Sequence, residues 1–458
     1  MGIRVTLLSA VDQVTGACTL IEAGRSRVLV DLGLVHGDDP PPDNTVLPIE
    51  RPDWLDAVVL THAHVDHCGR MPMLGRHGFA GPVFMSRPTA DLLPIVLHAS
   101  ARVQRRLHHA PVRRGESPPP ILYDTQEVDV FLSKINGVQW NQTTPITADI
   151  DLTLVPSGHV LGAASVVLTC RCDGRTRRIL VSGDLGPNTS SPIPPPAAPP
   201  EADLVVMECT RGDVEDGGQV SALDELRTTL RHARASEQII IAPVFALGRT
   251  QSLLHRLAQC DQIDELNMPV VLDSAAGVRL TNVHDRHSDQ LNEAAKGMHR
   301  DGLDPLRPRS LRVARSKKEA AFIRDLSGPA VILAGHGFAE GGAVLAHLKR
   351  WLPSSRARLA LIGYMAPNTL GGRLADDPPR VKIEGKWFDV QAPIDRLDGF
   401  SGHADAPELQ SWLSSIPGPR PVVVLHHGDA TPRKVLADVL TTNGWKALRP
   451  EIGQAIDV

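Results

Sequence analysis

Residues 57–69 join a strand-length apolar run to a cluster of metal-ligand side chains: Ala57-Val58-Val59-Leu60-Thr61-His62-Ala63-His64-Val65-Asp66-His67-Cys68-Gly69. Three histidines and one aspartate follow the apolar run within six residues, so they can converge on one small volume at the end of a buried strand. Neutral imidazoles suit zinc and similar cations, and a carboxylate adds compensating charge. The alternative is a polar loop with incidental histidines, which this spacing disfavours.

Ligand-type residues also lie at the ends of other predicted strands or in the loops between them. They are Asp31, His159, Asp184, Glu208 and His427. A single histidine or aspartate in such a position is usually a helix cap or a solvated loop residue. Several strand ends directed at one edge of a layered sheet are, in contrast, the usual location of an α/β active site. We therefore expect these residues to belong to one site.

The composition is that of a globular protein: 42% of the 458 residues are hydrophobic and 22% are charged. Lys and Arg number 48 against 52 Asp and Glu, and this net charge of −4 excludes a protein that coats nucleic acid through a strongly basic surface. No apolar run reaches the roughly 18 residues that span a bilayer. Six cysteines are too few for a disulfide scaffold, and the N-terminus does not resemble a secretory signal, so we expect a cytoplasmic protein without membrane contact.

Short runs rich in Val, Ile and Leu alternate with longer runs of helical period, which predicts an α/β fold class. The predicted strands are residues 27–30, 57–60, 179–181, 204–207, 239–242, 270–272, 331–333, 359–362 and 422–425. The predicted helices are residues 90–106, 221–235, 250–258, 342–351 and 407–415. Between them, the proline-rich residues 191–200 predict a stiff connector.

Four ordered motifs resemble those of the metallo-β-lactamase fold: Asp31, His62-x-His64-x-Asp66-His67, His159 and Asp184. Later segments resemble the β-CASP branch of that superfamily, the nucleic-acid-processing metallohydrolases. These segments are residues 208–213, 243–249, 363–364, 400–405 and 427–429. The resemblance implies a four-layer αββα fold formed by residues 1–211 and 368–458, with an α/β β-CASP domain inserted at 212–367. It also implies a substrate cleft at the junction of the two domains.

The resemblance assigns a role to each candidate site residue. The first metal would have three histidine ligands: His62, His64 and His159. The second metal would have three further ligands, with Asp184 bridging both metals: Asp66, His67 and His427. Asp31 would fix the ligand loop by hydrogen bonds, and Glu208 would pair with His403, which would protonate the leaving oxygen. The expected catalytic residues are therefore Asp66, Asp184, Glu208 and His403, and the expected cofactors are two Zn²⁺, with Mn²⁺ as the alternative.

The implied activity is a metal-dependent ribonuclease in which two metals activate a hydroxide, leaving a 5′-phosphate and a 3′-hydroxyl. His427 favours RNA, because family members with histidine at this motif act on RNA whereas DNA-repair members typically have valine. The alternatives are a DNA nuclease of the same family, a metal-binding but non-catalytic RNA-processing subunit, and a small-molecule ester or lactam hydrolase. Endonuclease and 5′→3′ exonuclease modes both stay open, as does the oligomeric state.

Three positions depart from the family pattern at places that would meet the substrate. Arg211 stands where a tyrosine is usual, and is either a phosphate contact or a tolerated surface change. His336-Gly337-Phe338 replaces a Ser-Gly-Met turn, which leaves phosphate binding to His336 and backbone N–H groups. Met365 replaces a residue that is often polar. The expected substrate-binding residues are His336, Gly337, Arg249 and Arg211.

Two basic segments could offset the mildly acidic total charge. In the first segment, helical spacing places four side chains on one face: Arg102, Arg105, Arg106 and His109. The second segment, residues 300–318, contains Arg307, Arg309, Arg312, Arg315, Lys317 and Lys318. Each run is either a phosphate contact or an ordinary solvated face. Because only 3% of residues are aromatic, extensive base stacking is disfavoured, which favours contacts along the backbone of single-stranded RNA.

Overall fold

The computed structural model describes residues 2–36, 43–109, 117–188, 192–215, 221–262, 266–313, 319, 323 and 326–458. Arg315, Lys317 and Lys318 of the second basic segment, and the start of the proline-rich connector, lie outside these residues. The chain divides into two compact units. The first unit comprises Met1–Gly186, Pro195–Gly217 and His403–Val458, and the second comprises Pro187–Pro194 and Gly218–Gly402.

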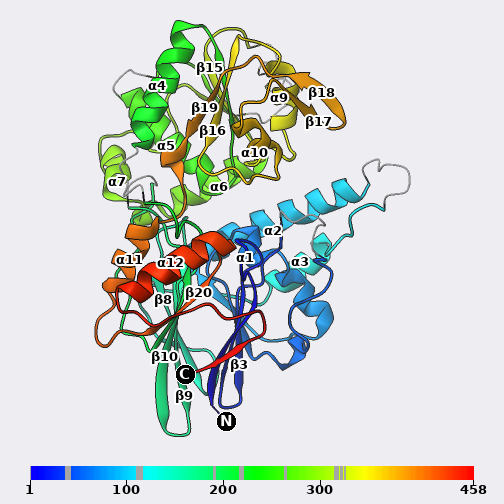
Figure 1. The fold of residues 1–458 in the computed structure, drawn as a ribbon. Helices are drawn as coiled ribbons and strands as arrows, with labels where there is room; N and C mark the ends of the chain where they lie inside the picture. Colours follow the sequence, from blue (N-terminus) through cyan, green and yellow to red (C-terminus); the bar gives the residue numbers. More distant parts are fainter. Residues whose placement is uncertain are drawn as a thin grey trace. The chain divides into compact units, whose positions relative to one another are not determined.

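The first unit contains two seven-stranded sheets (Figure 1). One sheet has the strand order β22 (Ala455–Asp457), β1 (Ile3–Ser9), β2 (Cys18–Ala23), β3 (Ser26–Val30), β4 (Ala57–Val59), β5 (Val83–Ser86) and β6 (Ile135–Val138). The other has the order β21 (Ala447–Leu448), β20 (Val422–His426), β11 (Leu204–Glu208), β10 (Arg175–Val181), β9 (Ala164–Cys172), β8 (Ile150–Pro156) and β7 (Thr144–Pro145). Both sheets mix parallel and antiparallel pairs.

The two sheets bury an apolar core between them. Alternate residues of β11 face opposite sides of its sheet, so Val206 joins this inner core. Val205 and Met207 instead pack with residues of α11 (Ala406–Ser414) and α12 (Ala430–Thr442) on the outer side. Burial on both faces is the reason that the sequence of this strand is continuously apolar.

Helices cover the outer faces of both sheets. On the first sheet, α2 (Arg87–His108) packs against β5 and β6, and α3 (Thr125–Leu132) packs against α2. On the second sheet, α11 and α12 cover the outer face. The layers are therefore αββα, and the predicted fold class is confirmed. Among the described residues, the helices are all too short or too polar to cross a bilayer.

The second unit is built on a six-stranded parallel sheet. Its strand order is β14 (Leu311–Val313), β13 (Val270–Asp273), β15 (Ala330–Ala334), β12 (Ile239–Pro243), β16 (Ala357–Ile362) and β19 (Ile394–Leu397). Along β12, Ile240 and Ala242 pack with α4 (Ala222–Ala235) and α5 (Arg249–Gln262). Ile239 and Ile241 pack with α9 (Val344–Trp351) and α10 (Leu370–Ala375) on the other face. The remaining described elements include α6 (Ala275–Arg286), α7 (Glu293–Arg300) and the hairpin β17 (Arg380–Ile383) and β18 (Lys386–Asp389).

Residues 368–402 belong to the second compact unit, which therefore extends beyond the predicted domain end at residue 367. The reason is local packing. Strand β19 pairs in parallel with β16, from Leu359–Ile394 to Ile362–Leu397, and so forms the edge of the second unit's sheet. Helix α10 and the β17–β18 hairpin contribute to the same apolar cluster as α9.

Candidate metal centre

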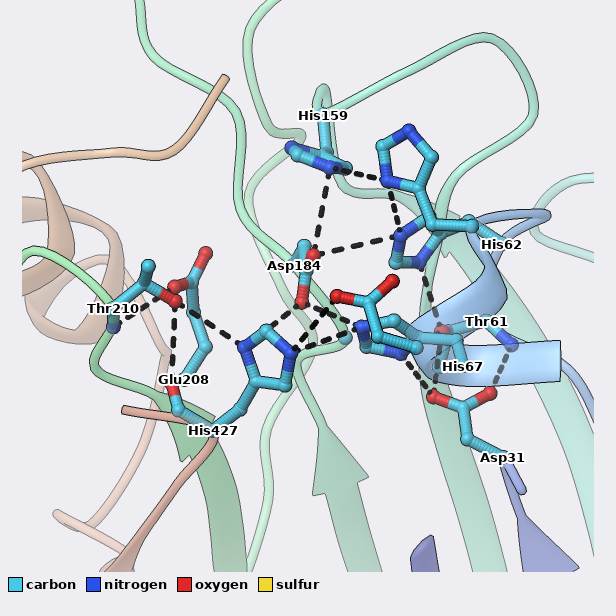
Figure 2. Close-up of polar contacts among 12 residues, drawn as sticks. Asp31, Thr61, His62, His67, His159, Asp184, Glu208, Thr210 and His427 are labelled. Atoms are coloured by element: carbon cyan, nitrogen blue, oxygen red, sulfur yellow. Dashed lines mark hydrogen bonds and ion pairs between the residues drawn. The ribbon is translucent and has the colours of Figure 1, made fainter. Parts of the chain in front are cut away.

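The candidate ligands lie in loops and at strand ends of the first unit (Figure 2). His62 and His64 follow β4, and the short helix α1 (Val65–Cys68) carries Asp66 and His67. His159 lies in the loop between β8 and β9, Asp184 follows β10, and His427 follows β20. The chain thus brings together side chains that are as much as 365 positions apart in sequence (427 − 62).

Two site residues adopt a left-handed backbone conformation that is uncommon for residues other than glycine. The φ angle is 61° at Asp31 and 52° at His427. Such a conformation costs on the order of 1–3 kcal/mol and persists where neighbouring contacts hold it. The N–H of Asp31 donates to the carbonyl of Val59, and the N–H of His427 donates to the carbonyl of Ala10, each at 2.9 Å. These bonds fix the directions in which the two side chains leave the strands.

Three histidines and Asp184 form a first group of converging donors. His64 Nδ1 lies 3.1 Å from His62 Nε2 and 3.1 Å from His159 Nε2. Asp184 Oδ2 lies 3.5 Å from His62 Nε2 and 3.4 Å from His159 Nε2. Ligands about 2.0–2.1 Å from a tetrahedral zinc ion are about 3.3–3.4 Å apart, so this spacing fits one small cation.

Asp66, His67 and His427 form a second group beside the first. The Nε2 atoms of His67 and His427 are 3.2 Å apart, and His427 Nε2 is 3.9 Å from Asp66 Oδ2. Asp184 Oδ1 lies 3.2 Å from His67 Nε2 and 3.5 Å from His427 Nδ1. The two oxygens of Asp184 therefore face different groups, as Figure 2 shows. Oδ1 is buried and has no well-aligned hydrogen-bond donor among the described residues, which fits a ligand atom.

The electrostatics of the site also fit divalent cations. Burial, together with the neighbouring His67, holds the pKa of His62 well below its ordinary value, so His62 is neutral and its lone pair is available. Burial alone would raise the pKa of Asp184, but the neighbouring His427 and His67 outweigh this effect and hold the pKa well below the usual range. Burial likewise opposes a charge on His67, yet Asp184 and Asp31 raise its pKa well above normal. A cation would supply the positive charge that these carboxylates stabilise.

Asp31 and Thr61 form a hydrogen-bonded support behind the second group. Asp31 Oδ1 accepts from Thr61 N at 2.8 Å, and Oδ2 accepts from Thr61 Oγ1 at 2.7 Å. Asp31 Oδ2 is also 2.7 Å from His67 Nδ1, which leaves His67 Nε2 directed at Asp184. A carboxylate on the far nitrogen orients a metal-binding imidazole in this way. Thr61 is not among the predicted site residues, although its position immediately before His62 is a usable signal.

Glu208 and His403 form a separate pair beside the two groups. His403 Nδ1 lies 3.1 Å from Glu208 Oε1 and 3.2 Å from Oε2, and Glu208 Oε1 also accepts from the N–H of Leu185. Burial by itself lowers the pKa of His403. The neighbouring Glu208 carboxylate raises it by a larger amount, so the pKa lies above the ordinary value. The ring of His403 lies 4.6 Å from that of His159, with Nδ1 already engaged by Glu208.

Neighbouring His426 and His427 have different environments. His426 Nε2 contacts the backbone carbonyl of Ser9 at 3.0 Å, and burial lowers the pKa of His426 to about 3. His427 lies among the candidate ligands, and its Nδ1 is 3.2 Å from the hydroxyl of Thr210. Only His427 of this pair is therefore positioned as a ligand.

The four expected substrate-binding residues are divided between the two units. Arg211 lies in the first unit, where its Nη1 is 3.5 Å from the carbonyl oxygen of His403. Arg249, His336 and Gly337 lie in the second unit, where they surround the ring of Phe245.

The two basic segments also differ from each other. In the second segment, Arg307 forms ion pairs with Asp285 and Asp304, and Arg309 pairs with Asp261. These guanidinium groups are already neutralised within the fold, which favours the solvated-face interpretation for them. On α2, the side chains of Arg102, Arg105 and Arg106 are exposed and form no ion pair or hydrogen bond with any other residue that the structure describes.

Comparison with known families gives three matches in order along the chain. A Beta-lactamase superfamily domain matches residues 26–241, a Beta-Casp domain matches 250–374, and a Zn-dependent metallo-hydrolase RNA specificity domain matches 387–450. Ribonuclease TTHA0252 from Thermus thermophilus is 31% identical, over 99% of this chain and 100% of that protein. This chain belongs to the β-CASP metallohydrolases of the metallo-β-lactamase superfamily.

Other relatives of this β-CASP metallohydrolase are longer than it is. Transcription termination factor FttA from Methanocaldococcus jannaschii is 28% identical, over 93% of this chain and 67% of that protein. FttA from Pyrococcus horikoshii is 26% identical, over 93% and 66%. A crystal structure of a protein of unknown function from Enterococcus faecalis covers both chains completely with a TM-score of 0.55 and 16% identity, which is a likeness of fold alone.

Proposed function

We propose that this chain is a ribonuclease that hydrolyses RNA phosphodiester bonds with two divalent cations. The observation that carries the proposal is the placement of Asp184, whose two oxygens face two separate groups of nitrogen and oxygen donors. The name of the ribonuclease from Thermus thermophilus and the RNA specificity domain support RNA as the substrate. The histidine at position 427, rather than valine, supports the same choice.

The two sites would be held by different residues. One cation would be bound by the first group: His62, His64, His159 and Asp184. The other would be bound by Asp184 and the second group: Asp66, His67 and His427. Two Zn²⁺ ions suit these ligands, with Mn²⁺ as the alternative. When bound, such a pair supplies a hydroxide near neutral pH and stabilises charge on the phosphate.

The remaining residues would prepare the proton transfer and the ligand geometry. Asp31 holds His67 through Nδ1 and keeps its Nε2 directed into the site. Glu208 holds His403 through Nδ1 and favours its protonated form, so His403 can donate a proton from Nε2 to the leaving oxygen. The products would be a 5′-phosphate and a 3′-hydroxyl. The described free cysteines, mostly buried, favour a cytoplasmic location.

Product mapping on a 5′-labelled single-stranded RNA tests this function. The purified chain should cleave RNA, lose activity in chelator and regain it with Zn²⁺ or Mn²⁺. Asp184→Ala should abolish cleavage, because it removes a donor from both groups. His77→Ala, which changes an exposed histidine outside the site, is the matched control and should leave cleavage unchanged.

Comparison of 5′-triphosphate and 5′-monophosphate RNA decides between internal and 5′-end-directed cleavage. A matched DNA oligonucleotide tests the alternative substrate. Undiminished RNA cleavage after complete metal removal would overturn the proposal, and so would faster cleavage of DNA than of RNA.

A further inference from the structure

Aromatic rings gather at one edge of the parallel sheet in the second unit. Phe245 follows β12, Phe338 follows β15, and Tyr364 follows β16. Because the carboxyl ends of neighbouring parallel strands meet at one edge, these three side chains come together although the chain is poor in aromatic residues. The carboxyl edge of a parallel sheet is also where α/β folds bind ligands.

The rings form a continuous edge-to-face arrangement. The Phe245 and Phe338 centroids are 4.8 Å apart with the ring planes at 83°, and the Phe338 and Tyr364 centroids are 6.4 Å apart at 86°. His336 adds a fourth ring, 5.3 Å from Phe245. Phe245 and Phe338 are half-buried, whereas Tyr364 is 48% exposed. The cluster therefore has a packed base and an accessible face.

Gly337 allows this close packing. A Cβ atom at Gly337 would lie 2.6 Å from the ring of Phe245, which is closer than carbon atoms approach in folded proteins. Any other residue would push the turn away from the ring. The glycine thus keeps the His336–Phe338 turn against Phe245.

Arg249 supplies a cation beside the rings. Its guanidinium carbon lies 5.0 Å from the Phe245 centroid and 5.8 Å from the Phe338 centroid, within the range of cation–π attraction. Nη2 donates to the carbonyl of Tyr364 at 2.8 Å. Nη1 is buried and has no hydrogen-bond partner among the described residues. A buried donor left without an acceptor is costly, so its position favours a ligand that brings an acceptor oxygen.

We propose that this aromatic–arginine cluster, made of Phe245, Arg249, Phe338 and Tyr364, binds one nucleotide of the RNA substrate. The base stacks on the exposed ring of Tyr364 next to Phe338, and an oxygen of the same nucleotide accepts from Arg249 Nη1. Stacking tolerates all four bases, since each has a π face. The subsite rests on the proposed ribonuclease function. The low aromatic content disfavours extensive base stacking, and this subsite would stack only a single nucleotide.

RNA binding by the full chain in chelator, which prevents cleavage, tests the subsite. The probe is a fluorescein-labelled single-stranded octauridine, and the readout is the dissociation constant from fluorescence anisotropy. Tyr364→Ala should weaken binding about tenfold, and Tyr364→Phe should retain it, because the phenyl ring still stacks. Trp387→Ala is the matched control: Trp387 is 58% exposed on β18 of the same unit, with Arg380 over its ring at 4.5 Å.

A set of octauridines with one abasic nucleotide at successive positions separates stacking from a loss of structure. In the wild-type chain, one position should weaken binding about tenfold, and the same position should have no effect in Tyr364→Ala. Equal affinities of wild type and Tyr364→Ala, or an abasic effect that persists in the variant, would overturn the subsite. If the wild type cleaves RNA while these results fail, only the subsite is wrong. If the wild type neither binds nor cleaves RNA, the ribonuclease function fails with it.

Discussion

At the scale of single residues, we propose that the residues that hold cations differ from the pair that handles a proton. His427 lies among donors whose nitrogen and oxygen atoms converge at 3.2–3.9 Å. His403 instead has Nδ1 engaged by Glu208, which suits the proton donor that we propose. Replacing each of these histidines by alanine should therefore affect metal content and cleavage rate differently.

We expect His427→Ala to lower the bound metal from about two ions per chain to about one, with loss of cleavage, because the second group would keep too few donors. His403→Ala should keep its metal and lower kcat by roughly 10²–10⁴-fold, the usual contribution of a general acid. Metal content is measured by mass spectrometry after extensive dialysis, with cleavage assayed on the same samples and His77→Ala as the control. Equal metal loss in both variants would contradict the separation of roles.

At the scale of elements, α2 combines a core-facing side with a basic, solvent-facing end. Leu92, Leu93 and Leu97 are fully buried, whereas Arg102, Arg105 and Arg106 near the C-terminal end are exposed. Positive side chains also suit this end of the helix, where the macrodipole is negative. This favourable interaction with the helix macrodipole is sufficient to explain why the three arginines lie at this end. A role in RNA binding is therefore tested directly.

We expect the triple change of Arg102, Arg105 and Arg106 to glutamine to weaken RNA binding and to flatten its salt dependence. The slope of log K against log salt should fall by up to about 0.7 for each phosphate of a single strand that the variant no longer binds. The control changes Arg171, Arg177 and Arg178 to glutamine, which removes the same charge from arginines that already form ion pairs. Parallel salt plots for the two triple variants would rule out a phosphate-binding role for α2.

At the scale of the whole molecule, each unit has its own buried core, and the second unit also buries neutral histidines. Burial lowers the pKa values of His255 and His284 to about 4. The neighbouring ionisable groups are Arg256 for His255, and Asp285 and His287 for His284. In the unfolded chain both histidines titrate near pH 6.5.

The second unit should therefore lose stability as the pH falls from about 6.5 to about 4. In this range the unfolded state binds protons that the folded state excludes, which costs at most about 3 kcal/mol for each histidine. Above pH 6.5 the stabilisation is fully present. Hydrogen exchange of β12 and α6 amides at several pH values, corrected for intrinsic rates, measures the effect. His284→Leu should reduce the pH dependence, His232→Leu on the exposed side of α4 should not, and a pH-independent stability would contradict the expectation.

Most elements that are apolar throughout were predictable from local pattern. The predicted strands near residues 204, 239 and 422 are β11, β12 and β20, because burial on both faces leaves a continuous apolar run in the sequence. The antiparallel strands β1 and β8 were missed, since polar residues interrupt them where one face is less buried. The predicted helices are all present, from α2 to α11, with ends shifted by a few residues.

Sequence pattern and the resemblance to the β-CASP family together named the candidate donor side chains, because ligand chemistry belongs to residue type and several candidates lie within a few positions of one another. The sequence could not tell which oxygen of Asp184 faces which group, that Asp31 contacts both Thr61 and His67, or that Arg249 lies beside the rings of Phe245 and Phe338. These relations join segments that are far apart in the chain. Their distances depend on how sheets and helices pack, and no local pattern of residues contains that information.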